Sequence, residues 1–131
     1  MAIRLATSLQ VDPPGAGSLV NSDGLAGKDA WGKRAVWCDA SGPLGGATVG
    51  IAILDHPSNP RHPTGWHART YGLFAVNPFA IKSFKLSDKD DPFVIPRGGS
   101  ATFRYRFLFH KGDAKAAGID ARFRAWASDG R

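Results

Sequence analysis

The sequence contains no glutamate: all 11 of its acidic residues are aspartate, against 17 lysine and arginine residues. It has a single cysteine, Cys38, which excludes an internal disulfide. One cysteine does not indicate whether the protein works in an oxidising or a reducing compartment. No apolar run exceeds about six residues, as in Val49–Leu54, whereas a membrane-spanning helix needs about 20. These absences exclude a disulfide-stapled scaffold and a transmembrane helix.

The 131 residues are enough for one domain, and we predict a single domain over residues 1–131. Hydrophobic residues make up 43% and charged residues 21%, which is typical of soluble globular proteins and excludes a disordered chain. With 16 Gly and 9 Pro, many turns and short strands are expected instead of a helical bundle. Arg4, Thr7 and Ser8 interrupt the first apolar stretch, so we expect no secretory signal in this segment. We expect a cytoplasmic protein or a natural N-terminus upstream of Met1.

Hydrophobic periodicity predicts an all-β fold, mainly an antiparallel β-sandwich, with one C-terminal α-helix. Ala47–Leu54 is short, apolar and β-branched, and Phe103–Phe109 alternates aromatic with basic residues, so both are expected as central, buried strands. Asp113–Ala127 has helical spacing, with Asp113 as the N-cap and Ile119, Phe123 and Trp126 on the face that covers a sheet. Further extended segments are expected at Ile3–Leu9, Leu19–Val20, Trp66–Val76 and Ile81–Leu86.

Three of the four histidines lie within twelve residues, at positions 56, 62 and 67. Pro57, Pro60 and Pro63 stiffen the loop between them, which can hold side chains in a fixed geometry. After this loop, strand alternation places His67, Arg69 and Tyr71 on one face. A proton donor or acceptor (His67), a cation (Arg69) and a phenol (Tyr71) then project from the same face of the strand.

Three interpretations of this segment remain open. The first is a pocket for a polyhydroxylated ligand, in which histidine transfers protons, Arg69 binds a carboxylate or oxyanion and Trp66 stacks on the ligand. The second is a metal site at the three histidines, whose spacing matches no helical zinc pattern. In the third, the polar groups only tie down the loop. For the first interpretation, the candidate catalytic residues are His67, His56 and Asp55, the candidate substrate-binding residues are Arg69, Tyr71, Trp66, Asn59 and His62, and no metal ligand is assigned.

The excess of basic over acidic residues is concentrated near the C-terminus. Residues 97–124 hold seven basic and two acidic residues, a local charge of +5. Aromatic residues alternate with Arg104 and Arg106 and are expected to point into the core, whereas a nucleic-acid surface exposes its aromatics. We therefore predict no nucleic-acid partner and no membrane partner, but a small-molecule or oligosaccharide ligand.

Several blocks of rare residues, in order, resemble the PmoA-like family, which carries the label "methane oxygenase PmoA" and is otherwise a domain of unknown function. The blocks are Asn21–Gly24, Trp31–Trp37, Gly50–Thr64, Trp66–Arg69, Tyr71–Leu73, Asn77–Phe79, Arg104–Arg106 and His110–Asp113.

The resemblance implies a β-sandwich, found often in bacteria that degrade plant or algal polysaccharides, in proteins about twice this length. This chain then corresponds to the C-terminal half, and strands that precede Ile3 in the family are missing from it. We expect such a chain to self-associate through exposed strand edges. The expected function is carbohydrate-active: a hydrolase, a lyase or a sugar-binding protein. The alternatives are a non-catalytic binding or structural module and, as the family label says, a metal-dependent oxygenase; the cofactor is unknown.

Overall fold

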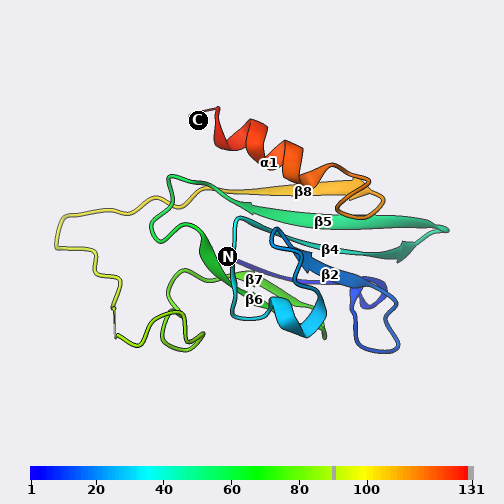
Figure 1. Ribbon diagram of the computed structural model, residues 1–131, viewed down its shortest axis with the longest axis horizontal. Helices are drawn as coiled ribbons and strands as arrows, with labels where there is room; N and C mark the ends of the chain where they lie inside the picture. Colours follow the sequence, from blue (N-terminus) through cyan, green and yellow to red (C-terminus); the bar gives the residue numbers. More distant parts are fainter. Residues whose placement is uncertain (90, 130–131) are drawn as a thin grey trace.

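The computed structural model describes residues 1–89 and 91–129 and contains two four-stranded antiparallel sheets with one helix (Figure 1). One sheet has the strand order β1-β7-β6-β3 and the other β2-β4-β5-β8. This arrangement confirms the predicted all-β fold with one C-terminal helix. The elements are β1 (Ala2–Arg4), β2 (Ser18–Asn21), β3 (Arg34–Ala35), β4 (Trp37–Leu44), β5 (Ala47–Asp55), β6 (Thr64–Ala68), β7 (Leu73–Val76), β8 (Tyr105–Lys111) and α1 (Ile119–Ala127), with short 3-10 turns at Thr7–Leu9 and Gly27–Ala30.

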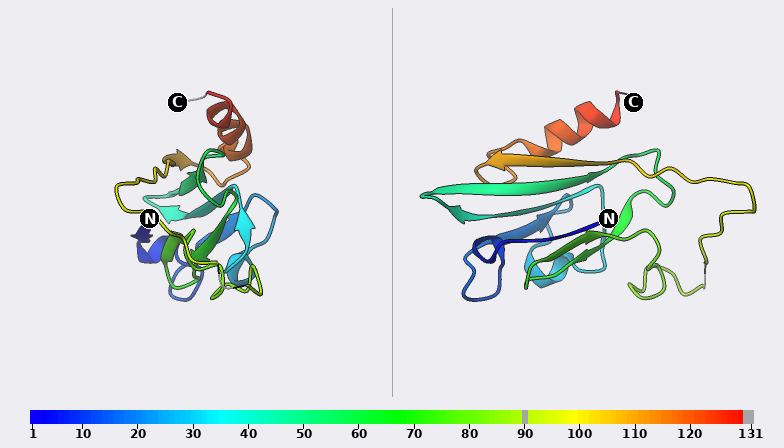
Figure 2. Two further views of the ribbon diagram at one scale, coloured as in Figure 1. Left: turned by 90° about the vertical axis from the view of Figure 1, so that its left-hand side faces the viewer. Right: turned by 180° about the vertical axis from the view of Figure 1, so that it is seen from behind.

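Strand alternation divides the apolar residues between two cores. Cys38 and Ile53 point from the β2-β4-β5-β8 sheet toward Trp66 and Phe74 of the other sheet, forming the core of the sandwich. Their neighbours on the opposite face, Leu54 among them, pack against α1. Figure 2 shows the resulting order of layers, with α1 outside the β2-β4-β5-β8 sheet. No helix of the described residues is long and apolar enough to span a membrane.

The predicted apolar face of the helix is confirmed, but its predicted start is wrong. Ile119, Phe123 and Trp126 are all buried against the sheet. Asp113 Oδ1 accepts a hydrogen bond from the Ala116 amide, so it caps an earlier turn. Gly118 then adopts the left-handed conformation (φ 63°, ψ 38°), and the α-helix begins after it.

The strand at Phe103–Phe109 is not central, contrary to prediction. β5 is central, as expected, but β8 begins at Tyr105 and forms the edge of its sheet. Phe107 is half-buried against the sandwich core, and Phe109 is 77% exposed. Alternation predicted which face these aromatic residues occupy, but it carries no information about a strand's place in the sheet.

Three other predicted extended segments are interrupted. Trp66–Val76 is a hairpin, because Arg69–Gly72 forms a turn in which Gly72 takes φ +95°. Residues 81–86 form turns that bury Ile81 and Phe84, so no strand forms there. At the N-terminus, β1 stops at Arg4. In Figures 1 and 2, the connection from β7 to β8 runs beyond the ends of the sheets.

Candidate functional site

Asp55 is the centre of a buried polar cluster at the end of β5. Its side chain is 0% exposed. Oδ1 accepts a hydrogen bond from Asn59 Nδ2 at 2.8 Å, and Oδ2 accepts from His62 Nδ1 at 2.8 Å and from the Thr64 amide at 3.1 Å. Both carboxylate oxygens are therefore engaged within the protein.

The loop that carries these residues is tied to its neighbours through backbone groups. Asn59 Nδ2 donates to the carbonyl of Arg104 at 2.6 Å, and Asn59 Oδ1 accepts from the amide of Arg104 at 2.5 Å. Arg34 donates to the carbonyls of Arg61 and Pro63 at 3.1 and 2.6 Å. These contacts match the interpretation in which polar groups tie down the loop.

Helix α1 contacts two of the loop's histidines. The His56 ring meets Trp126 edge-on, with centroids 4.8 Å apart, and His62 stacks on Phe123 at 6.5 Å. His56 Nδ1 accepts a hydrogen bond from the Ser58 amide at 3.1 Å, and His56 is 6% exposed. His56 and Asp55 thus lie where solvent and substrate have little access.

A second cluster lies on the outer face of the β1-β7-β6-β3 sheet. The guanidinium carbon of Arg69 lies 4.3 Å from the centroid of the Trp31 ring. His67 contacts Trp31 and Phe84 edge-on, at centroid distances of 6.4 and 5.7 Å. We call these four residues the His67–Arg69 face.

The polar groups of the His67–Arg69 face make no hydrogen bonds within the described residues. Across residues 1–89 and 91–129, the Arg69 guanidinium has no hydrogen-bond or ion-pair partner, and its Nε is buried without one. The His67 nitrogens likewise have none in this part of the chain. Partial burial and the nearby Arg69 charge lower the pKa of His67, so the imidazole is neutral at pH 7.

The structure divides the predicted site residues between different places. His67 and Arg69 share a face, as alternation predicts, whereas the Asp55 cluster lies at the end of β5 and under α1. Tyr71 falls in the turn after Arg69, is 49% exposed and contacts Arg4 at 5.7 Å. Trp66 is fully buried in the sandwich core.

Two partners of this face escaped the sequence analysis. Trp31 is not among the predicted site residues, and Phe84 was assigned to an extended segment. Trp31 follows the 3-10 turn Gly27–Ala30, and Phe84 belongs to the turns after β7. Nothing in the local sequence links either residue to Arg69, because only the tertiary fold brings the three segments together.

The three histidines of the metal-site interpretation do not converge. His56 contacts Trp126, His62 binds Asp55, and His67 lies against Phe84. In the described ranges, no group of three or more His, Cys, Asp or Glu side chains is arranged to hold a metal ion.

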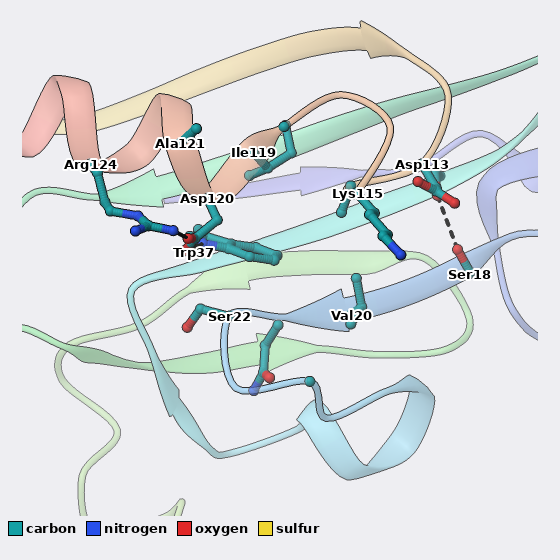
Figure 3. A pocket seen from close by; sticks show the side chains of 15 residues that line it. Ser18, Val20, Ser22, Trp37, Asp113, Lys115, Ile119, Asp120, Ala121 and Arg124 are labelled. Carbon is teal, nitrogen blue, oxygen red and sulfur yellow. Dashed lines mark hydrogen bonds and ion pairs between the residues drawn. The ribbon is translucent and has the colours of Figure 1, made fainter.

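A groove of about 620 Å³ lies between α1, the β8–α1 connection and β2 (Figure 3). Val20, Trp37 and Ile119 line its apolar part, and Lys115 points from the connection toward β2. Asp120 accepts a hydrogen bond from the Trp37 indole at 3.3 Å. The groove contains none of the predicted site residues, but its volume lies within the range of small-molecule pockets.

Residues 1–124 match the model of a family described as a family of unknown function (DUF6807). The match includes every predicted site residue and the whole His67–Arg69 face. No curated protein and no solved structure matches the chain significantly.

Proposed function

Because the chain belongs to DUF6807, a family whose description states no activity, we propose its function from geometry: it is a binding module for acidic carbohydrates. One observation carries this proposal. Arg69 and His67 lie side by side on a sheet face with their hydrogen-bonding groups unused among the described residues. A planar guanidinium with free donors is suited to a carboxylate, which it binds through two parallel hydrogen bonds.

The surroundings of Arg69 favour a sugar acid over a simple anion. The Arg69 guanidinium lies over the Trp31 ring, and the neutral His67 imidazole can exchange hydrogen bonds with hydroxyl groups. Arg4 pairs with Leu73 across the β1–β7 ladder and brings a second cation beside the exposed Tyr71 ring. An aromatic ring beside a cation suits a pyranose that carries a carboxylate. The resemblance to PmoA-like proteins, with its link to polysaccharide degradation, supports the same ligand class.

Binding is a better proposal than catalysis for this chain. A hydrolase or lyase needs a proton-transfer group within reach of the substrate. Asp55 and His56, the candidates for that task, are buried and hydrogen-bonded inside the protein. His67 is open but stands beside a guanidinium and two aromatic rings, with no carboxylate partner among the described residues.

Calorimetric titration with oligogalacturonate and with a neutral galactose oligomer tests the proposal. We expect binding of the acidic oligomer only, weakened about tenfold or more in Arg69→Gln, because a charge-assisted bidentate pair is lost. Arg69→Lys keeps the charge but not the planar fork and should recover only part of the affinity. Arg97→Gln, which removes an exposed charge in a distant turn, is the matched control. Equal binding of both oligomers, or no effect of Arg69→Gln, would contradict the proposal.

The groove beside α1 is a second candidate site, favoured by its volume and by the single lysine that points across it. Its apolar lining and Lys115 suit a small amphipathic acid, such as an aromatic carboxylate. Titration with such an acid should quench Trp37 fluorescence, and Lys115→Gln should weaken that titration while leaving oligogalacturonate binding unchanged. If Lys115→Gln does not weaken the titration, the acid does not bind in the groove.

A further inference from the structure

A second arginine lies in register with Arg69 on the outer face of the β1-β7-β6-β3 sheet. The Arg69 amide donates to the carbonyl of Leu73 at 2.7 Å across the β6–β7 hairpin, and Leu73 pairs with Arg4 of β1. Residues directly opposite one another in antiparallel strands project from the same face of the sheet. Arg69, Leu73 and Arg4 therefore form one row across the sheet.

Each arginine of this row lies beside an aromatic ring. The guanidinium carbon of Arg69 lies 4.3 Å from the centroid of Trp31, and that of Arg4 lies 5.7 Å from the centroid of Tyr71. Across residues 1–89 and 91–129, neither guanidinium has a hydrogen bond or an ion pair. Asp12, which accepts a hydrogen bond at the turn after Arg69, pairs with neither of them. The face thus presents the same unit twice, an unpaired cation beside an aromatic ring.

The surface between the two units is low and apolar. Leu73 lies between the two arginines and is half-buried. In the next row of the sheet, Ala75 pairs with His67 on one side and with Ala2 on the other, so only methyl groups lie between the imidazole and the edge strand. A pyranose ring carries C–H groups on its faces, and contact with apolar side chains removes these groups from water. Its hydroxyl and carboxylate groups project from the rim of the ring and stay free to meet the cations.

One end of this row is closed and the other is open. The Phe84 ring packs on the outer face at Gly65 of β6, where a Cβ atom would lie 2.6 Å from it. Phe84 also meets Trp31 edge-on, with centroids 5.5 Å apart, so the two rings close the β6 side of the face. At the other end, Arg4 is exposed on β1, which is the edge strand of its sheet. A ligand longer than one sugar therefore extends from Arg69 toward Arg4.

From this repeated unit we infer that the His67–Arg69 face and the Arg4–Tyr71 pair together bind a chain of at least three uronic acid residues that lies across the strands. The inference rests on the proposed function. With strands about 4.8 Å apart, the backbone positions of Arg69 and Arg4 lie about 10 Å apart, which is about the length of two linked pyranose rings. The carboxylates of the first and third residues then reach Arg69 and Arg4, and each guanidinium binds its carboxylate through two parallel hydrogen bonds. The middle ring lies over Leu73, and the third ring lies beside Tyr71.

Calorimetric titration with mono-, tri- and hexagalacturonate tests the length of the site. Trigalacturonate should bind the wild type at least about tenfold more tightly than the monomer, whereas three carboxylates offered to a single site would gain only about threefold. Hexagalacturonate should gain no more than about fourfold over the trimer, because it offers the same site about four registers. Triaspartate, which carries carboxylates on a peptide, should bind at least about tenfold more weakly than the trimer. A trimer that gains only about threefold overturns the inference, and triaspartate that binds as tightly as the trimer overturns the uronic acid class.

Substitutions at Arg4 separate this inference from the proposed function. Arg4→Gln should lower the ratio of trimer to monomer affinity from at least about tenfold to about threefold, because the second carboxylate loses its partner. Arg4→Lys keeps the charge without the planar fork and should restore part of this ratio. Arg97→Gln, in a distant turn, is the matched control and should keep the ratio of the wild type.

Arg69→Gln should weaken the binding of both the monomer and the trimer. If it does so while Arg4→Gln keeps the ratio of the wild type, the inference fails and the proposed function stands. If no galacturonate binds the wild type, both fail.

Discussion

At the scale of single residues, Asp55 shows how a candidate catalytic group can be a structural one. Its carboxylate is the acceptor for Asn59, His62 and the Thr64 amide in the interior of the chain. Sequence clustering grouped Asp55, Asn59 and His62 with His67 and Arg69 in one candidate pocket, whereas the structure places the first three in a separate buried cluster. It did not distinguish a pocket from a buried brace, because both use the same residue types at the same spacing.

Asp55→Ala should destabilise the protein by about 3 kcal/mol, because it leaves three donors in the interior without an acceptor. Urea unfolding measures the change, with the exposed Asp88→Ala as a control expected to stay within about 0.5 kcal/mol. Binding of oligogalacturonate should persist under folding conditions. Loss of binding with little loss of stability would instead place Asp55 in the ligand site.

His67 should make the protein less stable as the pH falls. Its pKa is lowered in the folded state by burial and by Arg69, so the unfolded chain binds this proton more tightly. The contribution of neutral His67 is complete above the unfolded pKa of about 6.5 and is lost as the pH falls through the lower, folded pKa.

Urea unfolding at pH 7.5 and at pH 5 measures this effect as the difference between the wild type and His67→Gln. At the lower pH, the free energy of unfolding of the wild type should fall relative to that of His67→Gln. A gap that is independent of pH would show that His67 has the same pKa in both states. The matched Arg69→Gln variant should shrink the effect, because it removes one of the two causes.

At the scale of elements, Gly50 and His110 join β5 to β8. The side chain of His110 is 3% exposed and bound to Asp39. The ring lies over Gly50, where a Cβ atom would come within 2.3 Å of His110 Cε1. Burial raises the pKa of Asp39 and the bond to His110 opposes that rise, so the pair depends on the ring staying in place.

Gly50→Ala should destabilise the protein by about 2 kcal/mol, because the added methyl pushes the imidazole away from a buried carboxylate. A double-mutant cycle in urea checks the cause: combined with His110→Ala, the Gly50 substitution should cost little more than His110→Ala alone. Full additivity of the two changes would mean that the clash lies with another neighbour, such as Ser41.

At the scale of the whole molecule, each of the two sheets ends in an edge strand on either side. Among residues 1–89 and 91–129, β8 is the last strand of one sheet and β1 the last strand of the other, and residues of both line the groove beside Phe109. The sequence analysis predicts self-association through such exposed strand edges, and association of the folded state alone couples folding to protein concentration.

The melting temperature should therefore rise with protein concentration. Calorimetric scans from about 5 to 500 μM should show this rise for the wild type and for Val94→Lys, which alters an exposed residue outside the strands, but not for Phe109→Lys, which places a charge at the β8 edge. A melting temperature that is constant across the series for the wild type would argue against dimerisation of the folded state.

The sequence by itself determined the local features of this protein. Turn residues, the β-branched segment Ala47–Leu54 and the alternation in Phe103–Phe109 predicted an all-β fold, and the spacing of Ile119, Phe123 and Trp126 predicted the buried face of the helix. These features follow from backbone preferences and from burial of apolar side chains, which depend on residues close together in the chain.

Only the tertiary structure decided which polar residues meet. Arg69 lies on Trp31, a residue 38 positions earlier, and Asp55 is sealed by its own loop and by α1. It also decided that β8 is an edge, which leaves Phe109 exposed although its pattern matches a buried strand. Periodicity reports the face on which a side chain lies. What covers that face depends on the packing of distant segments, which no local pattern records.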